Sequence, residues 1–125
     1  MTSVAKKNPK ISIITVVKNN EKFIEKNILS VINQTYKNYE HIIVDGNSSD
    51  GTLKIINKYR NKISKIISEK DDGLYDAMNK GIKNATGDII SILNSDDYYY
   101  ENALNIVKKY FEKKPDLDFL YGSVI

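Results

Sequence analysis

Four acidic residues, Asp88, Asp96, Asp97 and Glu101, fall within one short window of the chain that holds no Lys, Arg or His. Adjacent carboxylates such as Asp96 and Asp97 repel each other unless a positive charge compensates them. A divalent cation bound by one or two carboxylates supplies that charge, and water or substrate phosphates complete its coordination. The pair therefore predicts a metal site, with capping of the following helix as the structural alternative.

Asp45 is a second carboxylate of interest, because it ends an apolar run and opens a loop rich in glycine and serine. Its oxygens can accept hydrogen bonds from a nucleobase imide or a ribose hydroxyl. The alternative is a turn aspartate that binds its own backbone. The loop matches neither the GxGxxG fingerprint nor a Walker loop. His41, the single histidine, lies inside a predicted strand, so we interpret it as structural.

Strands and helices that would position these residues alternate along the chain. Apolar runs predict strands at residues 11–17, 41–44, 63–67 and 89–93. Apolar spacing predicts helices at about residues 21–33, 53–59, 75–82 and 103–111. This alternation is typical of an α/β fold with a mostly parallel sheet and helices on both faces, similar to a Rossmann fold. Ligands bind such sheets at the carboxyl ends of the strands, so four polar loops should converge on one rim.

Composition places the chain among ordinary globular domains. It has 125 residues, of which 41% are hydrophobic and 28% are charged, values far from those of disordered chains. We expect residues 1–9, which are polar and end at Pro9, to form a flexible lead-in, and residues 10–125 to form one domain. The absence of cysteine excludes a disulfide scaffold, thiolate zinc sites and iron–sulfur clusters.

Membrane-spanning and nucleic-acid-binding patterns are both missing from the sequence. The most apolar stretch, residues 11–17, is far shorter than the ~20 residues that cross a bilayer, and no signal-peptide cleavage site follows the N-terminus. The net charge is only +3 and Arg60 is the single arginine, so no basic face for nucleic acid is expected. We expect a cytoplasmic location, with peripheral association at the inner face of the membrane left open.

Four segments carry a family resemblance: KISIITVVKN at 10–19, IVDGNSSDGT at 43–52, DGLYDAMNKGI at 72–82 and LNSDD at 93–97. Together they resemble the inverting nucleotide-sugar glycosyltransferases of the GT-A fold, the bacterial group that builds surface polysaccharides of the cell envelope. Each motif alone is weakly specific, but four in this order and spacing are strongly so. The resemblance covers residues 10–125, and it favours the functional interpretation of Asp45, Asp96 and Asp97.

The resemblance also implies how the donor would bind. The residues that it places at the nucleotide are Thr15, Val17, Asn19, Asp45, Asp72, Gly73, Asp76 and Asp96. Among these, Asp45 would contact the base and the loop at 72–76 would close the pocket. Asp96 and Asp97 would hold Mn²⁺ or Mg²⁺ on the diphosphate, where the metal neutralises charge on the departing nucleoside diphosphate. Asn94 departs from the family pattern, because many members carry the first Asp of an Asp-x-Asp motif there.

The implied activity is transfer of a sugar from a nucleoside diphosphate donor, most commonly UDP, to a glycan or lipid-linked acceptor. Inverting transfer needs a general base, which in the family lies well after the acidic motif. This chain ends at Ile125 on an apolar run, so we expect a nucleotide-binding half that carries no catalytic residue, does not transfer sugar alone and is prone to self-association. The alternatives are a stand-alone nucleotide- and metal-binding module and a receiver-like or flavodoxin-like module.

Overall fold

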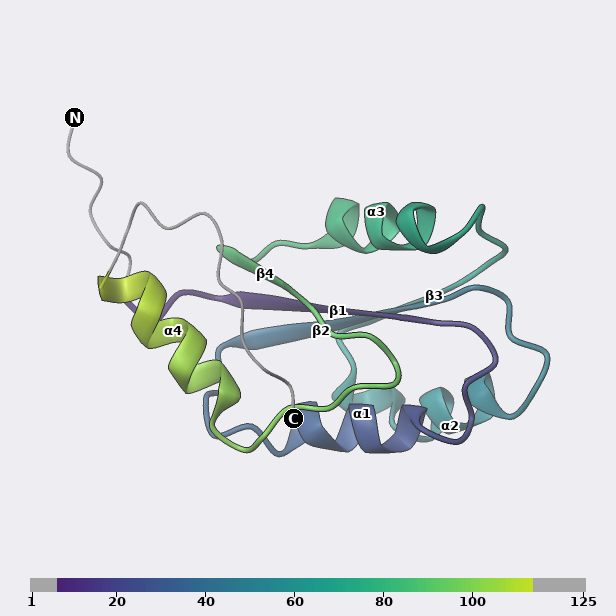
Figure 1. Cartoon of the computed structure of the whole chain (residues 1–125), viewed down its shortest axis with the longest axis horizontal. Helices are drawn as coiled ribbons and strands as arrows, with labels where there is room; N and C mark the ends of the chain where they lie inside the picture. The colour runs from purple at the N-terminus through teal and green to yellow at the C-terminus, as the bar shows by residue number, and fades with distance from the viewer. Residues whose placement is uncertain (1–6, 114–125) are drawn as a thin grey trace.

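A computed structural model describes residues 7–113 of the chain. The strands are β1 (Ile11–Val17), β2 (Tyr39–Asp45), β3 (Lys65–Ser68) and β4 (Ile89–Ile92). The helices are α1 (Ile24–Ile32), α2 (Thr52–Lys58), a short 3-10 helix (Arg60–Lys62), α3 (Leu74–Asn84) and α4 (Ala103–Lys113). The strands form one parallel sheet in the order β3-β2-β1-β4, with α3 on one face and α1 and α2 on the other (Figure 1). The predicted α/β fold class is confirmed.

Strand β1 lies in the middle of the sheet, and all seven of its residues are buried. Its alternate side chains pack against opposite layers, as the two-residue period of a strand requires. Ile13 packs in one cluster with Val31 of α1, whereas Ile14 packs in another with Ala77 of α3. Thr15 therefore projects toward the α1 side, where it is one of the few polar residues of the interior.

Helix α3 packs on the sheet mainly through small residues, and Met78 is the one apolar residue of its predicted stripe that packs against the core. Ala77 and Gly81 are buried, whereas Tyr75 is 81% exposed and Ile82 is 42% exposed. A Cβ atom at Gly81 would lie 2.5 Å from Cγ2 of Ile14, so the missing side chain lets the helix approach β1 closely. The spacing of apolar residues thus predicts the helix correctly. The face that the helix buries is the one whose small residues allow it to lie close to β1.

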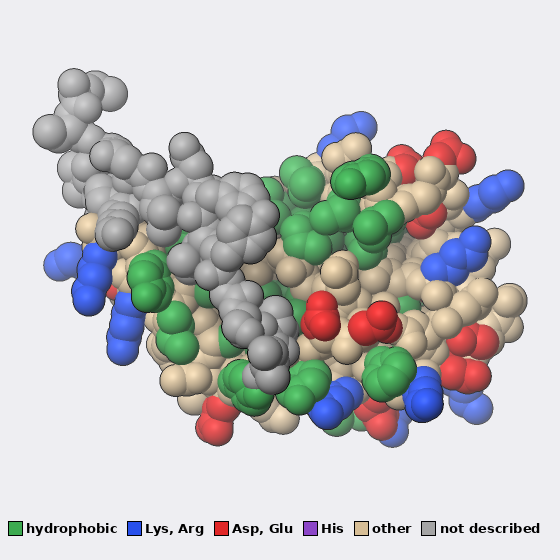
Figure 2. All heavy atoms as spheres, viewed as in Figure 1, with side chains coloured by type: hydrophobic (Ala, Val, Ile, Leu, Met, Phe, Trp, Pro, Cys, Tyr) green, Lys and Arg blue, Asp and Glu red, His purple; other side chains and the backbone are tan. Residues whose placement is uncertain are grey.

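Exposed apolar side chains gather beside this helix. Ile90 and Ile92 of the edge strand β4 are both exposed, and Figure 2 shows hydrophobic side chains clustered over α3 and β4. Within residues 7–113, every helix is too short or too polar to cross a bilayer. The apolar run from Phe119, predicted as a further strand, lies outside the described residues.

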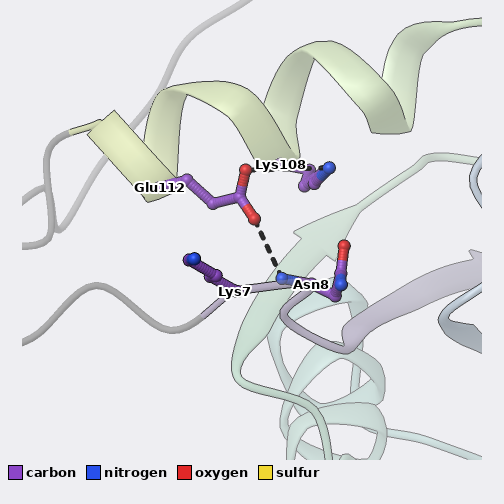
Figure 3. Close-up of a pocket in the computed structure, with 4 residues that line it drawn as sticks. All are labelled: Lys7, Asn8, Lys108 and Glu112. Atoms are coloured by element: carbon purple, nitrogen blue, oxygen red, sulfur yellow. Dashed lines mark hydrogen bonds and ion pairs between the residues drawn. The ribbon is translucent and has the colours of Figure 1, made fainter.

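The two residues at the end of the predicted lead-in, Asn8 and Pro9, form hydrogen bonds with other parts of the chain. The Asn8 N–H donates to Oε2 of Glu112 over 2.9 Å, and the Tyr36 hydroxyl donates to the Pro9 carbonyl over 2.6 Å. Asn8 and Glu112 line a surface hollow of about 370 Å³ together with Lys7 and Lys108 (Figure 3). This hollow lies at the amino end of β1, opposite the predicted site.

Strand β3 begins later than predicted because a short helix uses the preceding residues. The Ile63 N–H donates to the Arg60 carbonyl over 3.2 Å and so ends the 3-10 helix. Ile63 is buried in the core without pairing in the sheet, and pairing runs from Lys65 to Ser68 alongside β2. In the sequence, an isoleucine that packs in the core outside a strand looks the same as a buried strand residue. The predicted strand therefore started too early.

Gly87 lies where the chain enters β4, and a substitution there tests the closeness of the packing. A Cβ atom at Gly87 would lie 2.7 Å from the Lys10 carbonyl oxygen and 2.9 Å from the Ser12 amide nitrogen, both backbone atoms. We expect Gly87→Ala to lower the free energy of unfolding by roughly 1–3 kcal/mol, measured by chemical denaturation.

Gly46→Ala is the matched control for this prediction. A Cβ atom at Gly46 meets only the carboxyl group of Asp71, which can rotate away. The control should therefore lose less than about 1 kcal/mol of stability. Equal denaturation midpoints for the Gly46 and Gly87 variants would contradict the predicted backbone clash.

Candidate functional site

The loop that follows β1 is hydrogen-bonded to the loop after β2 and to the loop after β4, at the carboxyl ends of the strands. Figure 1 shows where these strands end. The Asn19 N–H donates to Oγ of Ser48 over 2.8 Å, which ties the loop after β1 to the loop after β2. On the other side, Nδ2 of Asn20 donates to Oγ of Ser95 over 2.9 Å and so reaches the loop after β4. The predicted convergence on one rim is thus confirmed for three of the four polar loops.

Asn19 shapes this rim with both its backbone and its side chain. It adopts a left-handed conformation with φ of 49°, which asparagine tolerates better than most residues. Its Oδ1 accepts hydrogen bonds from the N–H groups of Ser49 at 2.8 Å and Asp50 at 3.3 Å. The side chain therefore braces the loop after β2, and its contact with a nucleotide stays a prediction.

Asp45 is completely buried, and both of its carboxylate oxygens accept hydrogen bonds from other residues of the chain. Oδ1 accepts a hydrogen bond from the Ser48 hydroxyl at 2.5 Å. Oδ2 accepts one from the Ser48 N–H at 3.1 Å and one from the Ser68 hydroxyl at 2.8 Å. This is the geometry of the turn-aspartate alternative, extended by a serine from β3. The contact between Asp45 and a base stays a prediction.

Asp72, Gly73 and Asp76, which are predicted to lie at the nucleotide, form a compact turn after β3 at the start of α3. Gly73 has φ of 110°, a conformation that favours glycine. Oδ2 of Asp76 accepts the Asp72 N–H at 2.8 Å and lies 3.5 Å from Nζ of Lys80. The hydrogen bond from Asp72 and the charge of Lys80 lower the pKa of the Asp76 carboxyl. Among the described residues, no hydrogen bond or ion pair joins this turn to the loop after β4.

The acidic pair lies on a tight turn that directly follows the buried Leu93. The Asp97 N–H donates to the Asn94 carbonyl over 2.9 Å and closes the turn. Asp96 is exposed, and its Oδ1 accepts a short hydrogen bond from Nδ2 of Asn20. Helix α4 begins only at Ala103, so neither aspartate caps it, and the structural alternative for this pair is wrong.

Within residues 7–113, neither Asp96 nor Asp97 forms an ion pair with a basic side chain, and the Asp97 carboxylate makes no hydrogen bond. The same range contains no group of three or more His, Cys, Asp or Glu side chains that could hold a metal by itself. Two uncompensated carboxylates nevertheless suit Mg²⁺ or Mn²⁺, which commonly bind one or two carboxylates together with substrate phosphates. The donor set therefore fits a metal shared with a phosphate ligand.

Thr15 and Val17, the two predicted nucleotide neighbours within β1, both lie in the interior. Oγ1 of Thr15 lies 2.8 Å from Nε2 of His41 and 3.2 Å from Oδ1 of Asn27. His41 is buried, as expected for a structural histidine. The Thr15 hydroxyl is thus engaged inside the protein, and its proximity to a nucleotide stays a prediction.

Burial of His41 predicts a pH dependence of stability. Desolvation lowers the pKa of the imidazole from 6.5 to about 3, so between these values the unfolded chain binds a proton that the folded chain does not. Stability therefore rises with pH in this window. As the pH falls through it, we expect the free energy of unfolding to drop by up to about 1.4 kcal/mol per pH unit.

His41→Gln isolates this contribution, because glutamine keeps a donor for Thr15 but does not titrate. Denaturant unfolding of both proteins across the same pH window measures the two slopes. We expect a shallower slope for His41→Gln, and identical slopes would show that His41 does not carry the effect.

Asn20 and Asn27 contact the acidic turn but were not predicted as site residues. Asn20 belongs to the polar loop that follows β1. Asn27 lies three residues after Ile24 and four before Val31, so it sits on the buried stripe of α1. A polar residue at that position in an amphipathic pattern is the signal that could have identified it.

The chain is similar to known glycosyltransferases along most of its described length. The model of the family "Glycosyl transferase family 2" matches residues 12–124. An uncharacterized glycosyltransferase of Rickettsia conorii is 40% identical over 106 residues, which are 83% of this chain and 17% of that protein. A PGL/p-HBAD biosynthesis glycosyltransferase of Mycobacterium bovis is 35% identical over 121 residues, which are 94% of this chain and 47% of that protein. The chain thus spans less than half the length of these relatives.

Solved structures agree with this assignment. TarS 1–349 of S. aureus in complex with UDP-GlcNAc superposes with a TM-score of 0.77 at 29% identity, covering 83% of this chain and 31% of that chain. The mannosyltransferase PcManGT of Pyrobaculum calidifontis, in complex with GDP-Man and Mn²⁺, gives a TM-score of 0.74 at 26% identity, covering 84% of this chain and 34% of that chain. The resemblance inferred from the four motifs is confirmed, and the chain belongs to glycosyl transferase family 2.

Proposed function

We propose that this chain is the donor-binding part of a metal-dependent glycosyltransferase that uses a nucleoside diphosphate sugar, with UDP as the nucleotide. The observation that carries the proposal is the pair Asp96 and Asp97 on the turn after β4, without a basic partner among residues 7–113. Two anionic side chains that the described fold leaves uncompensated are suited to a cation that arrives with its ligand.

The position of the pair in the sheet supports the same function. From β1 the chain adds β2 and then β3 on one side, and it then crosses over to place β4 on the other side of β1. Ligands of open parallel sheets bind outside the carboxyl ends of the strands, at the point where the strand order reverses. The loops after β1 and β4 flank that point here, and Asn20 joins them.

Asp96 and Asp97 would hold the metal ion against the diphosphate of the donor. When bound, the ion supplies positive charge that stabilises the departing nucleoside diphosphate. Asn20 orients the Asp96 carboxylate through its amide, and the Asp97 carboxylate has no competing partner among the described residues. The UDP-GlcNAc complex of TarS and the complex of PcManGT with GDP-Man and Mn²⁺ support a nucleotide-sugar donor for this chain as well.

The acceptor in this proposal is a glycan or a lipid-linked sugar, as implied by the family. Transfer also needs a general base that deprotonates the acceptor hydroxyl. We assign no such base within residues 7–113, so the proposal concerns donor binding by this chain and sugar transfer by the protein to which it belongs.

Isothermal titration calorimetry of the chain with UDP, GDP and dTDP, each with and without Mn²⁺, tests the proposal. We expect UDP to bind more tightly than the other two nucleotides, and only weakly after Mn²⁺ is removed with EDTA. Absence of binding for all three nucleotides in the presence of Mn²⁺ would overturn the proposed function. A parallel assay for hydrolysis of the UDP-sugar then separates a binding module from a chain that turns over its donor alone.

A further inference from the structure

We propose that Asn27 is a positioning residue that clamps the acidic turn from the protein interior, with Thr15 and His41 as its support. This inference rests on the proposed function for the ligand that the turn binds. The clamp itself rests on hydrogen bonds to the backbone of the turn. It joins helix α1 to residues that follow β4, far away in the sequence.

The side-chain amide of Asn27 forms hydrogen bonds with both ends of the turn. Its Nδ2 donates to the Asn94 carbonyl over 2.9 Å and to the Asp97 carbonyl over 3.0 Å. These two residues are also joined by the bond that closes the turn. Asn27 is fully buried, so water cannot replace the amide without opening the packing around α1. The two hydrogen bonds bracket Asp96 and set the backbone that carries both carboxylates.

Hydrogen bonds on the other side of Asn27 fix which way its amide points. Because both Nδ2 protons are used by the turn, Oδ1 is left to accept, and the Thr15 hydroxyl donates to it over 3.2 Å. Thr15 has a single hydroxyl proton, so its oxygen accepts from Nε2 of His41 at 2.8 Å. All three side chains are at most 1% exposed. A directed chain of hydrogen bonds thus runs from β2 through β1 and α1 to the acidic turn.

The same face of α1 holds the rest of the segment between the turn and α4. Oγ of Ser30 accepts the Tyr99 N–H at 3.1 Å. Gln34, just beyond the helix, donates to the Tyr100 carbonyl over 2.6 Å and accepts the Leu104 N–H at 3.0 Å. Gln34 is as buried as Asn27 and makes a similar number of backbone contacts, but it does not touch the acidic turn. The chain therefore contains its own control for the role of Asn27.

Preorganisation is what this clamp contributes to binding. Metal ligands work best when hydrogen bonds from behind hold them in place before the ion arrives. Loss of the Asn27 amide would remove one hydrogen bond from each of two backbone carbonyls and would leave the turn free to rearrange. The affinity for nucleotide that depends on the metal should fall, while the affinity that does not depend on it should change little.

The first experiment measures UDP binding with and without Mn²⁺ for Asn27→Ala and Gln34→Ala. We expect Asn27→Ala to weaken Mn²⁺-dependent UDP binding by about 10–100-fold, the usual cost of losing a group that supports metal ligands. The metal-free affinity should stay near that of the parent chain, and Gln34→Ala should keep the Mn²⁺ dependence. Equal losses in the two variants, or no loss in Asn27→Ala, would overturn the inference.

A second experiment tests the clamp without any ligand. Amide hydrogen exchange of the Asp97 N–H reports on the bond that closes the turn. We expect exchange there to be faster in Asn27→Ala than in Gln34→Ala, and unchanged exchange would overturn the clamp. Faster exchange combined with no Mn²⁺-dependent binding by the parent chain would instead retain the clamp and reject the proposed function.

Thr15→Val provides a milder variant if Asn27→Ala does not fold. Valine keeps the shape of threonine but removes the hydroxyl that orients Oδ1 of Asn27. We expect exchange of the Asp97 N–H to increase in Thr15→Val, by less than in Asn27→Ala. Exchange identical to that of the parent chain would show that the support behind Asn27 is not needed.

Discussion

Replacement of Asp97 with alanine is expected to abolish Mn²⁺-dependent UDP binding while the fold stays intact. The backbone of Asp97 closes the acidic turn and accepts a hydrogen bond from Asn27, and both contacts survive the substitution. Its carboxylate has no partner within residues 7–113, so its removal leaves no buried group unsatisfied there. We expect a loss of at least about 100-fold, because even supporting groups behind a metal ligand contribute 10–100-fold.

Calorimetry with UDP, with Mn²⁺ and after addition of EDTA, measures this effect. Glu101→Ala is the matched control, because Glu101 is an exposed acid from the same window whose carboxylate makes no hydrogen bond or ion pair in the described part of the chain. The control removes the same charge and should keep the Mn²⁺ dependence. Unchanged UDP affinity in Asp97→Ala would reject its assignment as a metal ligand, and an equal loss in Glu101→Ala would indicate a general charge effect.

Ile14→Ala is expected to cause the largest loss of stability among the substitutions considered. Ile14 is fully buried in the middle of the central strand, where it packs in the cluster that joins the sheet to α3. Removal of its side chain loses buried apolar contacts and leaves a cavity beside Gly81, which has no side chain to fill it. We expect the free energy of unfolding to fall by about 2–5 kcal/mol.

Ile90→Ala makes the matched comparison, since Ile90 is the same residue type in the same sheet. It lies on the edge strand β4 and is 45% exposed, so its truncation should cost less than about 1 kcal/mol. Urea denaturation of both variants gives the two values. Similar losses would contradict the placement of Ile14 at the centre of the core.

The order of strands and helices could be predicted from the sequence, whereas several boundaries could not. Helix α1 begins at Ile24 instead of near residue 21, because the Asn20 carbonyl accepts the N–H groups of both Phe23 and Ile24 in a preceding turn. Strand β2 extends to Tyr39 and Asp45 because its backbone pairs with β1 over the full length of both strands. The polarity of neighbouring residues did not indicate these boundaries. They depend on which other segment supplies the hydrogen-bonding partners.

The candidate site was predicted unevenly for the same reason. The acidic pair could be found because two adjacent carboxylates after an apolar run form a local pattern. The environment of Asp45 could not be found in this way, since one of its partners, Ser68, comes from another strand. Asn27 was missed although it lies on a buried helix face, because its partners are 67 and 70 residues away in the sequence.

The sequence by itself determined the alternation of strands and helices, the apolar first strand and the family to which the chain belongs. These properties follow from the spacing of apolar residues and from the order of the motifs. Both can be recognised in the sequence without knowing which distant segments are in contact. Only the tertiary structure decided that β4 lies beside β1, that α3 packs through Gly81 and that Asn27 holds the acidic turn. Contacts between distant segments depend on how the elements pack, and packing leaves no periodic signal in either segment alone.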